Sequence, residues 1–513
     1  MLFNSTTFIA EFLPISLIGY YLAGRMSTVA AAAWLCMVSI AFYAYWRWPS
    51  SFVLLMCGSI AFNYTCGILL TYAQNSPKWQ NLILAFGILC NISLLFYFKY
   101  LFHLFGFLHD IDPNLPDFGQ VVLPLGISFF TFTQIGYLID CKQGLAKERG
   151  FVNYVLFVTF FPHLIAGPIL HHREMMPQFA DRKTYRFDPE NLAVGATLFI
   201  IGLAKKVLIA DTISGIADRG FAHPEALLLW GSWATILAYA LQLYFDFSGY
   251  SDMAIGIARM FGIRFPPNFN SPYKATSIID FWQRWHMTLT RYLTLYLYTP
   301  MAMAMTRRRA AKGLSVSRRA TAEFPAFFSL IFLPTLGTMF LAGIWHGAGL
   351  NYIIFGLLHA FYLSANHAWR IFGPAAPKLP RPMPIAWGIR AAQTLLTLLC
   401  VFVAQDFFRA ETTGSALQLL AGLAGLHGID RSSATIGLHD SATIALLFLA
   451  VWVLPNAQEL TNAFAPILGK VEAPFRRWMA WQPNMAWGIG FGLIFAISLA
   501  TISRPTRFLY FQF

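Results

Sequence analysis

The stretch from Phe340 to Ala360 reads FLAGIWHGAGLNYIIFGLLHA, an apolar segment with a histidine and two glycines near its middle. About 20 mostly apolar residues in a helix span a bilayer, so this stretch has the character of membrane-buried helix, and the candidate spans on either side of His346 are 324–344 and 350–369. An ionisable side chain there is costly unless it faces a bundle interior or a watery cavity. His346 is therefore the first candidate for chemistry, although buried histidines also serve as hydrogen-bonding contacts between helices.

The neighbours of His346 favour a binding site beside it. Trp345 offers a large apolar wall, which makes it a candidate substrate-binding residue. Gly347 and Gly349 remove side-chain bulk, so another helix or a substrate chain could approach the backbone closely. The same glycines could instead be simple packing notches between helices.

The composition of the whole chain excludes an ordinary soluble protein. Of 513 residues, 57% are hydrophobic, 17% aromatic and only 12% charged, and the mean hydropathy is +0.56. Apolar stretches of span length recur from Phe8 to Ile502 without the period-two alternation of a membrane barrel. We therefore predict an all-α, polytopic membrane protein in which residues 1–513 form a single membrane domain.

The formal net charge of +13 does not indicate a nucleic-acid partner. The basic residues are scattered through short loops, and no basic stripe is interleaved with base-stacking aromatics. Cytoplasmic loops of membrane proteins carry an excess of lysine and arginine, which explains the charge more simply than an anionic ligand does. The densest cluster predicts one such loop and consists of Arg307, Arg308, Arg309, Lys312, Arg318 and Arg319.

The sequence predicts no metal site. The six cysteines are spread out without metal-type spacing and have the surroundings of packing residues. His171 and His172 are adjacent, which by itself is a poor geometry for two ligands, and no second cluster with zinc-type spacing accompanies them.

A second histidine lies in Ile279 to Tyr292, which reads IDFWQRWHMTLTRY. Asp280 and Arg284 are four residues apart, so they can pair along a helix. Aromatic rings and long basic side chains both settle at the membrane interface. The stretch is thus either an interfacial anchor helix or a site that uses His286, with Arg284 as a candidate substrate-binding residue.

Acids and amides precede this second histidine. Asp246 and Asp252 lie in YFDFSGYSD, between the candidate spans 227–245 and 253–261. They could orient a histidine or bind a polar substrate, or they could cap helices on either side of a break. Asn268 and Asn270, in PPNFNSPY, predict a turn rich in side-chain acceptors. We treat all four as candidate substrate-binding residues.

Six motifs together resemble the membrane-bound O-acyltransferases, and most closely the bacterial branch that O-acetylates alginate and related exopolysaccharides. The resemblance runs through nearly the whole chain and is specific, because several motifs are long and they occur in the family's order. The motifs are LPLGISFFTF (123–132), FFPHLIAGP (160–168), YFDFSGYSDMAIG (244–256), DFWQRWH (280–286), IWHGAGLNY (344–352) and FLYFQF (508–513).

The resemblance implies a fold and a reaction. The fold would have more than ten transmembrane or re-entrant helices around a central tunnel, in the bacterial inner membrane. Acetyl-CoA would be the cytoplasmic donor, an extracytoplasmic polysaccharide the acceptor, and a periplasmic acetyltransferase the partner; no further cofactor is implied. The family's essential histidine falls on His346 and its other motif histidine on His286, so both are predicted to be catalytic.

The chemistry of an imidazole side chain also fits a catalytic role for His346. A neutral imidazole can take the proton of a hydroxyl that attacks a thioester, an effect worth about 10² to 10⁴ in rate. His286 would lie at the cytoplasmic mouth and orient the donor or the acceptor. The chain has no Gly-x-Ser-x-Gly elbow for a covalent serine relay, so direct transfer is the simpler hypothesis.

The sequence also departs from the family. After His286 the usual acid and glycine pair are missing, and Leu350 stands where an aromatic residue is usual. These departures leave the acceptor open among alginate, cellulose, another exopolysaccharide and peptidoglycan. Two other classes of protein also remain: a transporter or flippase that uses the buried histidines as a proton relay, and a scaffold with an inert histidine core.

Overall fold

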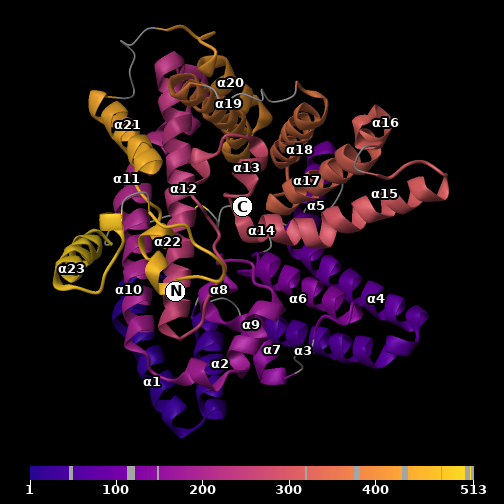
Figure 1. Ribbon diagram of the computed structural model, residues 1–513, viewed down its shortest axis with the longest axis vertical. Coiled ribbons are helices and arrows are strands. Elements are labelled where there is room, and N and C mark those ends of the chain that lie inside the picture. Colours follow the sequence, from indigo (N-terminus) through magenta and orange to yellow (C-terminus); the bar gives the residue numbers. More distant parts are fainter. Residues whose placement is uncertain are drawn as a thin grey trace. The chain divides into compact units, whose positions relative to one another are not determined.

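The computed structural model describes residues 1–45, 50–112, 122–146, 150–317, 320–374, 382–429, 437–474, 477–502 and 509. Within these residues every regular element is an α-, π- or 3-10 helix (Figure 1), which confirms the all-α prediction. Arg318, Arg319 and the terminal FLYFQF motif, apart from Leu509, lie outside the described residues.

Several helices have the length and composition of membrane spans, because each offers an apolar run with few charges. In the described chain, five reach the length of a span: Ser51–Asn75, Pro77–Gly106, Pro189–Ala222, Phe324–His346 and Met383–Arg409. Three more apolar helices are shorter: Thr28–Ala44, Leu438–Val453 and Met485–Thr501. The protein is thus a multi-pass membrane protein, while the larger number of helices and the tunnel stay predictions.

The chain divides into two compact units. The first comprises Met1–Leu208, Ser248–Pro267 and Ala457–Thr506. Its main helices are α1 (Leu13–Met26), α2 (Thr28–Ala44), α3 (Ser50–Tyr72), α4 (Pro77–Phe96), α5 (Phe102–Ile111), α6 (Ile127–Lys142), α7 (Phe151–Thr159), α8 (Phe161–Leu164), α9 (His172–Ala180), α10 (Pro189–Ala204), α22 (Ala457–Leu460) and α23 (Met485–Thr501). The prediction of a single membrane domain stays a prediction.

The second unit comprises Ile209–Phe247, Asn268–Asn456 and Arg507–Phe513. Its core is rich in aromatic and branched side chains. The helices are α11 (Asp211–Ala222), α13 (Ile278–Trp282), α14 (Met287–Leu293), α15 (Thr299–Ala311), α16 (Phe324–Phe327), α17 (Leu333–His346), α18 (Leu350–Phe372), α19 (Met383–Arg409), α20 (Thr413–Leu423) and α21 (Leu438–Val453).

Helix α12 (Leu229–Met260) runs without interruption through the segment where the sequence allowed a break. Asp246 and Asp252 lie inside this helix and not at its ends, so the alternative that they cap two helices around a break is wrong. Both carboxylates are buried and hydrogen-bonded to groups far away in the chain. These tertiary partners satisfy the acids without a helix terminus.

Helices α17 and α18 form a hairpin that positions the histidine of the WHG motif. Gly343 and Gly356 let the two helices meet backbone to backbone: a methyl group on Gly343 would lie 2.3 Å from the Tyr352 carbonyl oxygen, and one on Gly356 would lie 2.4 Å from that of Met339. Any larger residue would push the helices apart. The close approach holds His346, the last residue of α17, against α18.

Candidate active site

The second unit contains an apolar cavity with three histidines in its wall. Aromatic and aliphatic side chains supply most of the wall, and the polar groups are few, as is typical of a small-molecule site. The lining consists of Leu243, Phe247, Phe281, Trp282, Trp285, His286, Leu289, His346, Phe355, His359, Val401, Gln405 and Phe408. The structure thus brings together His286 and His346, which lie 60 positions apart in the sequence.

His346 is half-buried and surrounded by aromatic rings. Its ring meets those of Phe355 and Phe408 edge to face, with centroids 5.7 and 5.0 Å away. The Trp345 ring is buried and lies 4.8 Å from that of His346. Trp345 therefore supports the histidine from the side, although the tryptophan is not part of the cavity lining that the described residues form.

His286, which the sequence placed at a cytoplasmic mouth, lies in the cavity wall and is only 2% exposed. Its Nδ1 lies 2.9 Å from Oδ1 of Asn268. The same oxygen accepts hydrogen bonds from the backbone N–H and the hydroxyl of Thr288, at 3.5 and 2.8 Å. A backbone N–H can only donate, so the Asn268 atom that faces these groups is the oxygen.

These contacts decide which nitrogen of His286 carries the proton. Since Asn268 presents an acceptor, Nδ1 must donate, and Nε2 of the neutral ring keeps its lone pair. His286 lies outside the helices that are long enough to span a membrane, and burial lowers the pKa of its imidazole to about 3. In the described part of the chain, Nε2 is buried and has no hydrogen-bond partner. The ring therefore offers the cavity an acceptor.

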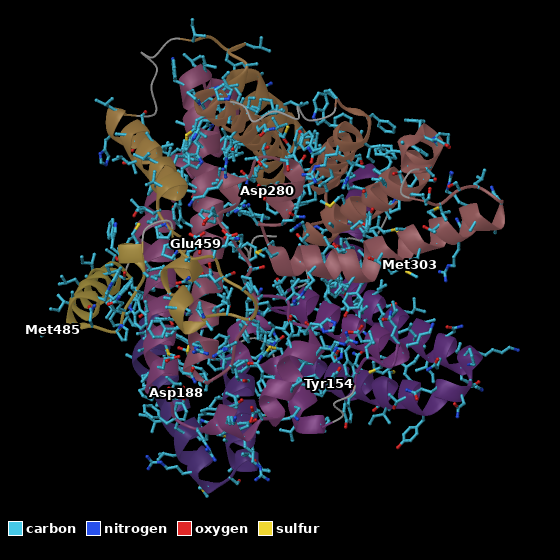
Figure 2. The ribbon with its side chains drawn as sticks, viewed as in Figure 1. Tyr154, Asp188, Asp280, Met303, Glu459 and Met485 are labelled. Atoms are coloured by element: carbon cyan, nitrogen blue, oxygen red, sulfur yellow. The ribbon has the colours of Figure 1, made fainter. Side chains whose placement is uncertain are left out.

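Backbone pairing holds His286 beside Asn268. The N–H of Asn270 donates to the carbonyl of Arg284, and that of Met287 donates to the carbonyl of Asn268, both at 2.9 Å. Nε of Arg284 donates to Asp280 Oδ1 at 2.7 Å, as the sequence spacing predicted. Asp280 is labelled on α13 in Figure 2. Asn270 and Arg284 thus fix the loop that carries the histidine, and neither is among the lining residues of the cavity.

Sequence reasoning missed the third histidine, His359, which is 1% exposed and lies on α18. The indole N–H of Trp282 donates to its Nδ1 over 3.2 Å. The signal that could have found it was present, because His359 is an ionisable residue in the same apolar stretch as His346.

Sequence reasoning also missed Gln405, a lining residue on α19. Its Nε2 donates to the Tyr273 hydroxyl at 3.4 Å, and that hydroxyl donates to the Ala240 carbonyl at 2.6 Å. The amide oxygen of Gln405 is buried and has no hydrogen-bond partner in the described chain. Gln405 is also a polar residue in an apolar stretch, but its partner Tyr273 is 132 positions away and no sequence pattern marks that contact.

The two predicted aspartates have structural partners. Asp246 Oδ2 accepts the backbone N–H of Leu509 at 3.1 Å, within the second unit. Asp252 belongs to the first unit, where its carboxylate pairs with Lys205 Nζ at 2.6 Å and accepts from Gln458 at 2.8 Å. Neither aspartate is among the described residues that line the cavity. Their role as substrate-binding residues stays a prediction.

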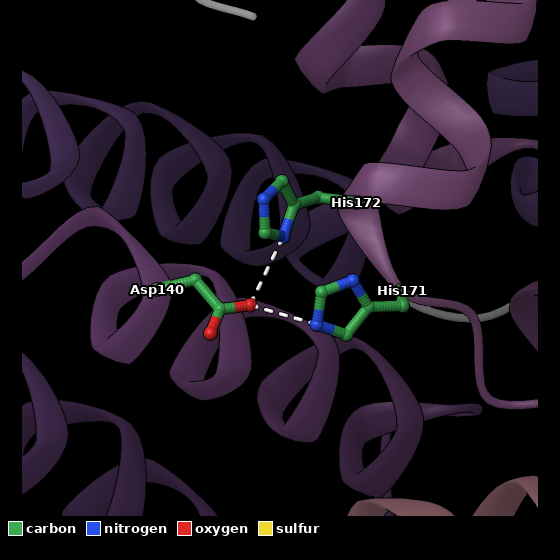
Figure 3. A group of neighbouring side chains, drawn as sticks. All are labelled: Asp140, His171 and His172. Carbon is green, nitrogen blue, oxygen red and sulfur yellow. Dashed lines mark ion pairs between the residues drawn. The ribbon is translucent and has the colours of Figure 1, made fainter. Parts of the chain in front are cut away.

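A separate cluster in the first unit joins Asp140, His171 and His172 (Figure 3). Oδ2 of Asp140 lies 2.8 Å from His171 Nε2 and 3.2 Å from His172 Nδ1. Nδ1 of His171 accepts the backbone N–H of Arg173, so the neutral ring carries its proton on Nε2 and donates it to Asp140. A metal bound at Nε2 of His171 would need the lone pair of that nitrogen, so the ring proton would have to move to Nδ1. The resulting Nδ1–H would then face the backbone N–H of Arg173. The arrangement fits a hydrogen-bonded triad better than a metal site.

Comparison with known proteins identifies the family. The sequence model of MBOAT, the membrane-bound O-acyltransferase family, matches residues 128–317. The chain is 40% identical to the peptidoglycan O-acetyltransferase of Helicobacter pylori, over 84% of this chain and 81% of that protein. It is 35% and 32% identical to the proteins named "Probable alginate O-acetylase AlgI" of Azotobacter vinelandii and Pseudomonas aeruginosa, in both cases over 100% of the two chains.

The matches cover the motifs on which the resemblance was based, and they extend far beyond them. Matching of this length, together with an all-helical fold that has several apolar spans, confirms the resemblance. The chain therefore belongs to the membrane-bound O-acyltransferase family and is an acyltransferase of the membrane.

Proposed function

We propose that this enzyme is an O-acetyltransferase that moves acetyl groups from a cytoplasmic thioester, acetyl-CoA, toward hydroxyl groups of an extracytoplasmic polysaccharide. One observation carries the proposal: His286 and His346 line the same apolar cavity. The names of the relatives, which refer to alginate and peptidoglycan, support a polysaccharide acceptor. We further propose that the enzyme lies in the bacterial inner membrane, that more than ten helices surround a central tunnel, and that a periplasmic partner completes the transfer.

The chemistry follows from the groups in the cavity. A hydroxyl attacks the thioester carbonyl while His346 takes the hydroxyl proton, and the proton leaves with the thiol when the C–S bond breaks. Walls of Phe247, Phe355 and Phe408 keep the thioester among apolar groups, which limits its loss to water. His286 accepts a hydrogen bond through Nε2 and so orients the donor or the acceptor.

Arg284 suits an anionic part of the donor. It lines an open cleft of the second unit together with Asp280, Arg390 and Gln393. Guanidinium groups bind phosphates through paired hydrogen bonds, and coenzyme A carries several phosphates. We propose this cleft as the place where the nucleotide end of the donor binds; Asp246, Asp252, Asn270 and Trp345 stay candidates for the remaining contacts with substrate.

The first test compares wild type with His346→Ala in nanodiscs that contain purified protein, acetyl-CoA and the periplasmic partner. We expect wild type to release coenzyme A and transfer labelled acetyl groups, and His346→Ala to lose about 10² to 10⁴ in rate because general-base help is gone. Monodisperse elution of both proteins checks that the variant folds.

The matched control is His223→Ala, since the His223 side chain is 77% exposed and lies outside the cavity lining. It should keep the wild-type rate. If His346→Ala and His223→Ala behave alike, His346 is not the base. If wild type handles no acetyl groups even with its partner and a polysaccharide present, the proposed acetyl donor and polysaccharide acceptor are wrong.

A further inference from the structure

The cavity wall holds two histidines with opposite hydrogen-bonding roles. Asn268 makes His286 an acceptor toward the cavity, as described above. The partner of His359 is Trp282, whose indole N–H can only donate. Nδ1 of His359 must therefore accept, so the neutral ring carries its proton on Nε2. His359 is fixed as a donor, whereas His286 is fixed as an acceptor.

Nε2–H of His359 has no hydrogen-bond partner among the residues that the structure describes. His359 is almost fully buried, and its only hydrogen bond among the described residues is the one from Trp282. Its ring is also held by Phe355 and Tyr362, with centroids 4.7 and 5.9 Å away. Because His359 lines the cavity, a ligand there that supplies an acceptor meets a donor that is already fixed in place.

Thioester chemistry creates such an acceptor. When a hydroxyl attacks the carbonyl carbon, the new C–O bond forms and the carbonyl π pair moves to oxygen, which becomes an oxyanion. The hydroxyl proton goes to the base. When the oxyanion collapses, the C–S bond breaks and the thiolate leaves with that proton. A donor fixed in advance near this oxygen stabilises the transition state without reorganisation.

We propose that His359 is a further catalytic residue, whose Nε2–H stabilises the oxyanion, and that Trp282 is a positioning residue that holds His359 in the donor tautomer. The inference rests on the proposed function, because it needs acyl transfer to occur in this cavity. His359 donates a hydrogen bond and keeps its proton, whereas His346 takes up a proton and His286 accepts a hydrogen bond. Trp282 contacts His359 both through the hydrogen bond and ring to ring, at 5.0 Å.

The test uses acetyl-CoA and its dithioester analogue, in which sulfur replaces the carbonyl oxygen. Sulfur is a weak hydrogen-bond acceptor, so the analogue gains little from an oxyanion donor. With acetyl-CoA we expect His359→Leu to lose about 10² to 10³ in kcat with little change in KM. With the dithioester the loss should be much smaller, because the contact is already weak. A merely structural residue would lower both rates alike.

Two further variants keep the test decisive if His359→Leu does not fold. His359→Gln places an amide N–H near the position of Nε2 and should recover most of the kcat that His359→Leu loses. Trp282→Phe removes the lock on the tautomer but keeps an aromatic ring, so kcat should fall less than in His359→Leu, with KM unchanged.

The outcomes separate the two proposals. If wild type does not turn over acetyl-CoA, the proposed function itself fails. If wild type is active and folded His359→Leu stays within about threefold of it, or loses the same factor with both substrates, the proposed function stands and the role of His359 is wrong. The acid limb of the pH–rate profile should also be the same in wild type and His359→Leu, since a general base would change it.

Discussion

His286 has an unusual backbone conformation for a residue with a side chain. Its φ and ψ of 43° and 51° lie in the left-handed region, which costs a non-glycine residue on the order of 1 to 3 kcal/mol. Neighbouring hydrogen bonds offset this cost, including one from Thr290 N–H to the His286 carbonyl at 3.0 Å. This conformation places the ring of His286 where it contacts Asn268 and also lines the cavity. The strained backbone thus positions a functional side chain.

The link between Asn268 and His286 predicts a change in pH dependence. Burial holds the pKa of His286 at about 3, so the wild-type ring is neutral well above pH 5. In Asn268→Asp a carboxylate would lie beside Nδ1 and stabilise the imidazolium, which raises the pKa of His286. The acceptor role of Nε2 needs the neutral ring. Activity of the variant should therefore fall as the pH drops through its raised pKa, as measured by kcat from pH 8 to 5.

Asn484→Asp is the matched control, because the exposed Asn484 caps α23 through its Oδ1, a contact that an aspartate keeps, and the bonded partner is the Trp487 N–H and not a histidine. Its pH profile should follow the wild type. Superimposable profiles for Asn268→Asp and wild type would mean that Asn268 does not govern the state of His286.

At the scale of helices, α10 and the C-terminal half of α12 meet through two pairs of glycines. A methyl group on Gly202 would lie 2.5 Å from the Gly249 carbonyl oxygen, and one on Gly195 would lie 2.5 Å from that of Gly256. The two glycines of α10 are seven residues apart, and so are the two glycines of α12. Each helix therefore presents its glycines on one face. In lipid, close backbone packing of this kind replaces the hydrophobic effect as the main cause of helix association.

We expect Gly202→Ala to destabilise the protein by about 1 to 3 kcal/mol, because the added methyl group meets backbone atoms that have no room to move. Thermal unfolding in detergent, followed by loss of monodisperse protein, measures the effect. Gly58→Ala in α3 is the control, since nothing lies within 4 Å of the added methyl group. Equal unfolding temperatures for the two variants would show that α10 and α12 do not depend on this contact.

For the whole molecule, the basic residues predict the orientation in the membrane. Arg307, Arg308, Arg309 and Lys312 lie at the end of α15 and just after it, and the exposed Ser315 follows them. Because positively charged loops stay in the cytoplasm, Ser315→Cys should react with a membrane-impermeant thiol reagent in inside-out vesicles and not in intact spheroplasts.

Wild type, which has no cysteine in this segment, gives the background labelling from its six cysteines. Labelling of Ser315→Cys in intact spheroplasts at the level seen in inside-out vesicles would place the loop outside. The donor side of the proposed reaction would then have to be reassigned.

The class of fold was determined by the sequence alone. In lipid every backbone polar group must be satisfied within its own segment or a closed sheet, so long apolar runs leave little choice but helices. The two helices on either side of His346 were predicted in the same way, as spans of 324–344 and 350–369, whereas the observed helices end at His346 and run from Leu350 to Phe372, so the stretch 340–360 is not one helix. His346 was found as a polar residue in apolar surroundings, whereas His286 was assigned its role through the family resemblance.

Tertiary structure decided what those residues can do. Trp282 and His359 are 77 positions apart, and Gln405 and Tyr273 are 132 apart, yet these pairs fix the polar groups of the cavity. Likewise, Asp246 inside α12 accepts its hydrogen bond from Leu509, 263 positions away in the sequence. A sequence pattern reports the preference of a segment for helix or lipid, whereas the role of a histidine nitrogen depends on which donor or acceptor the folded chain brings to it.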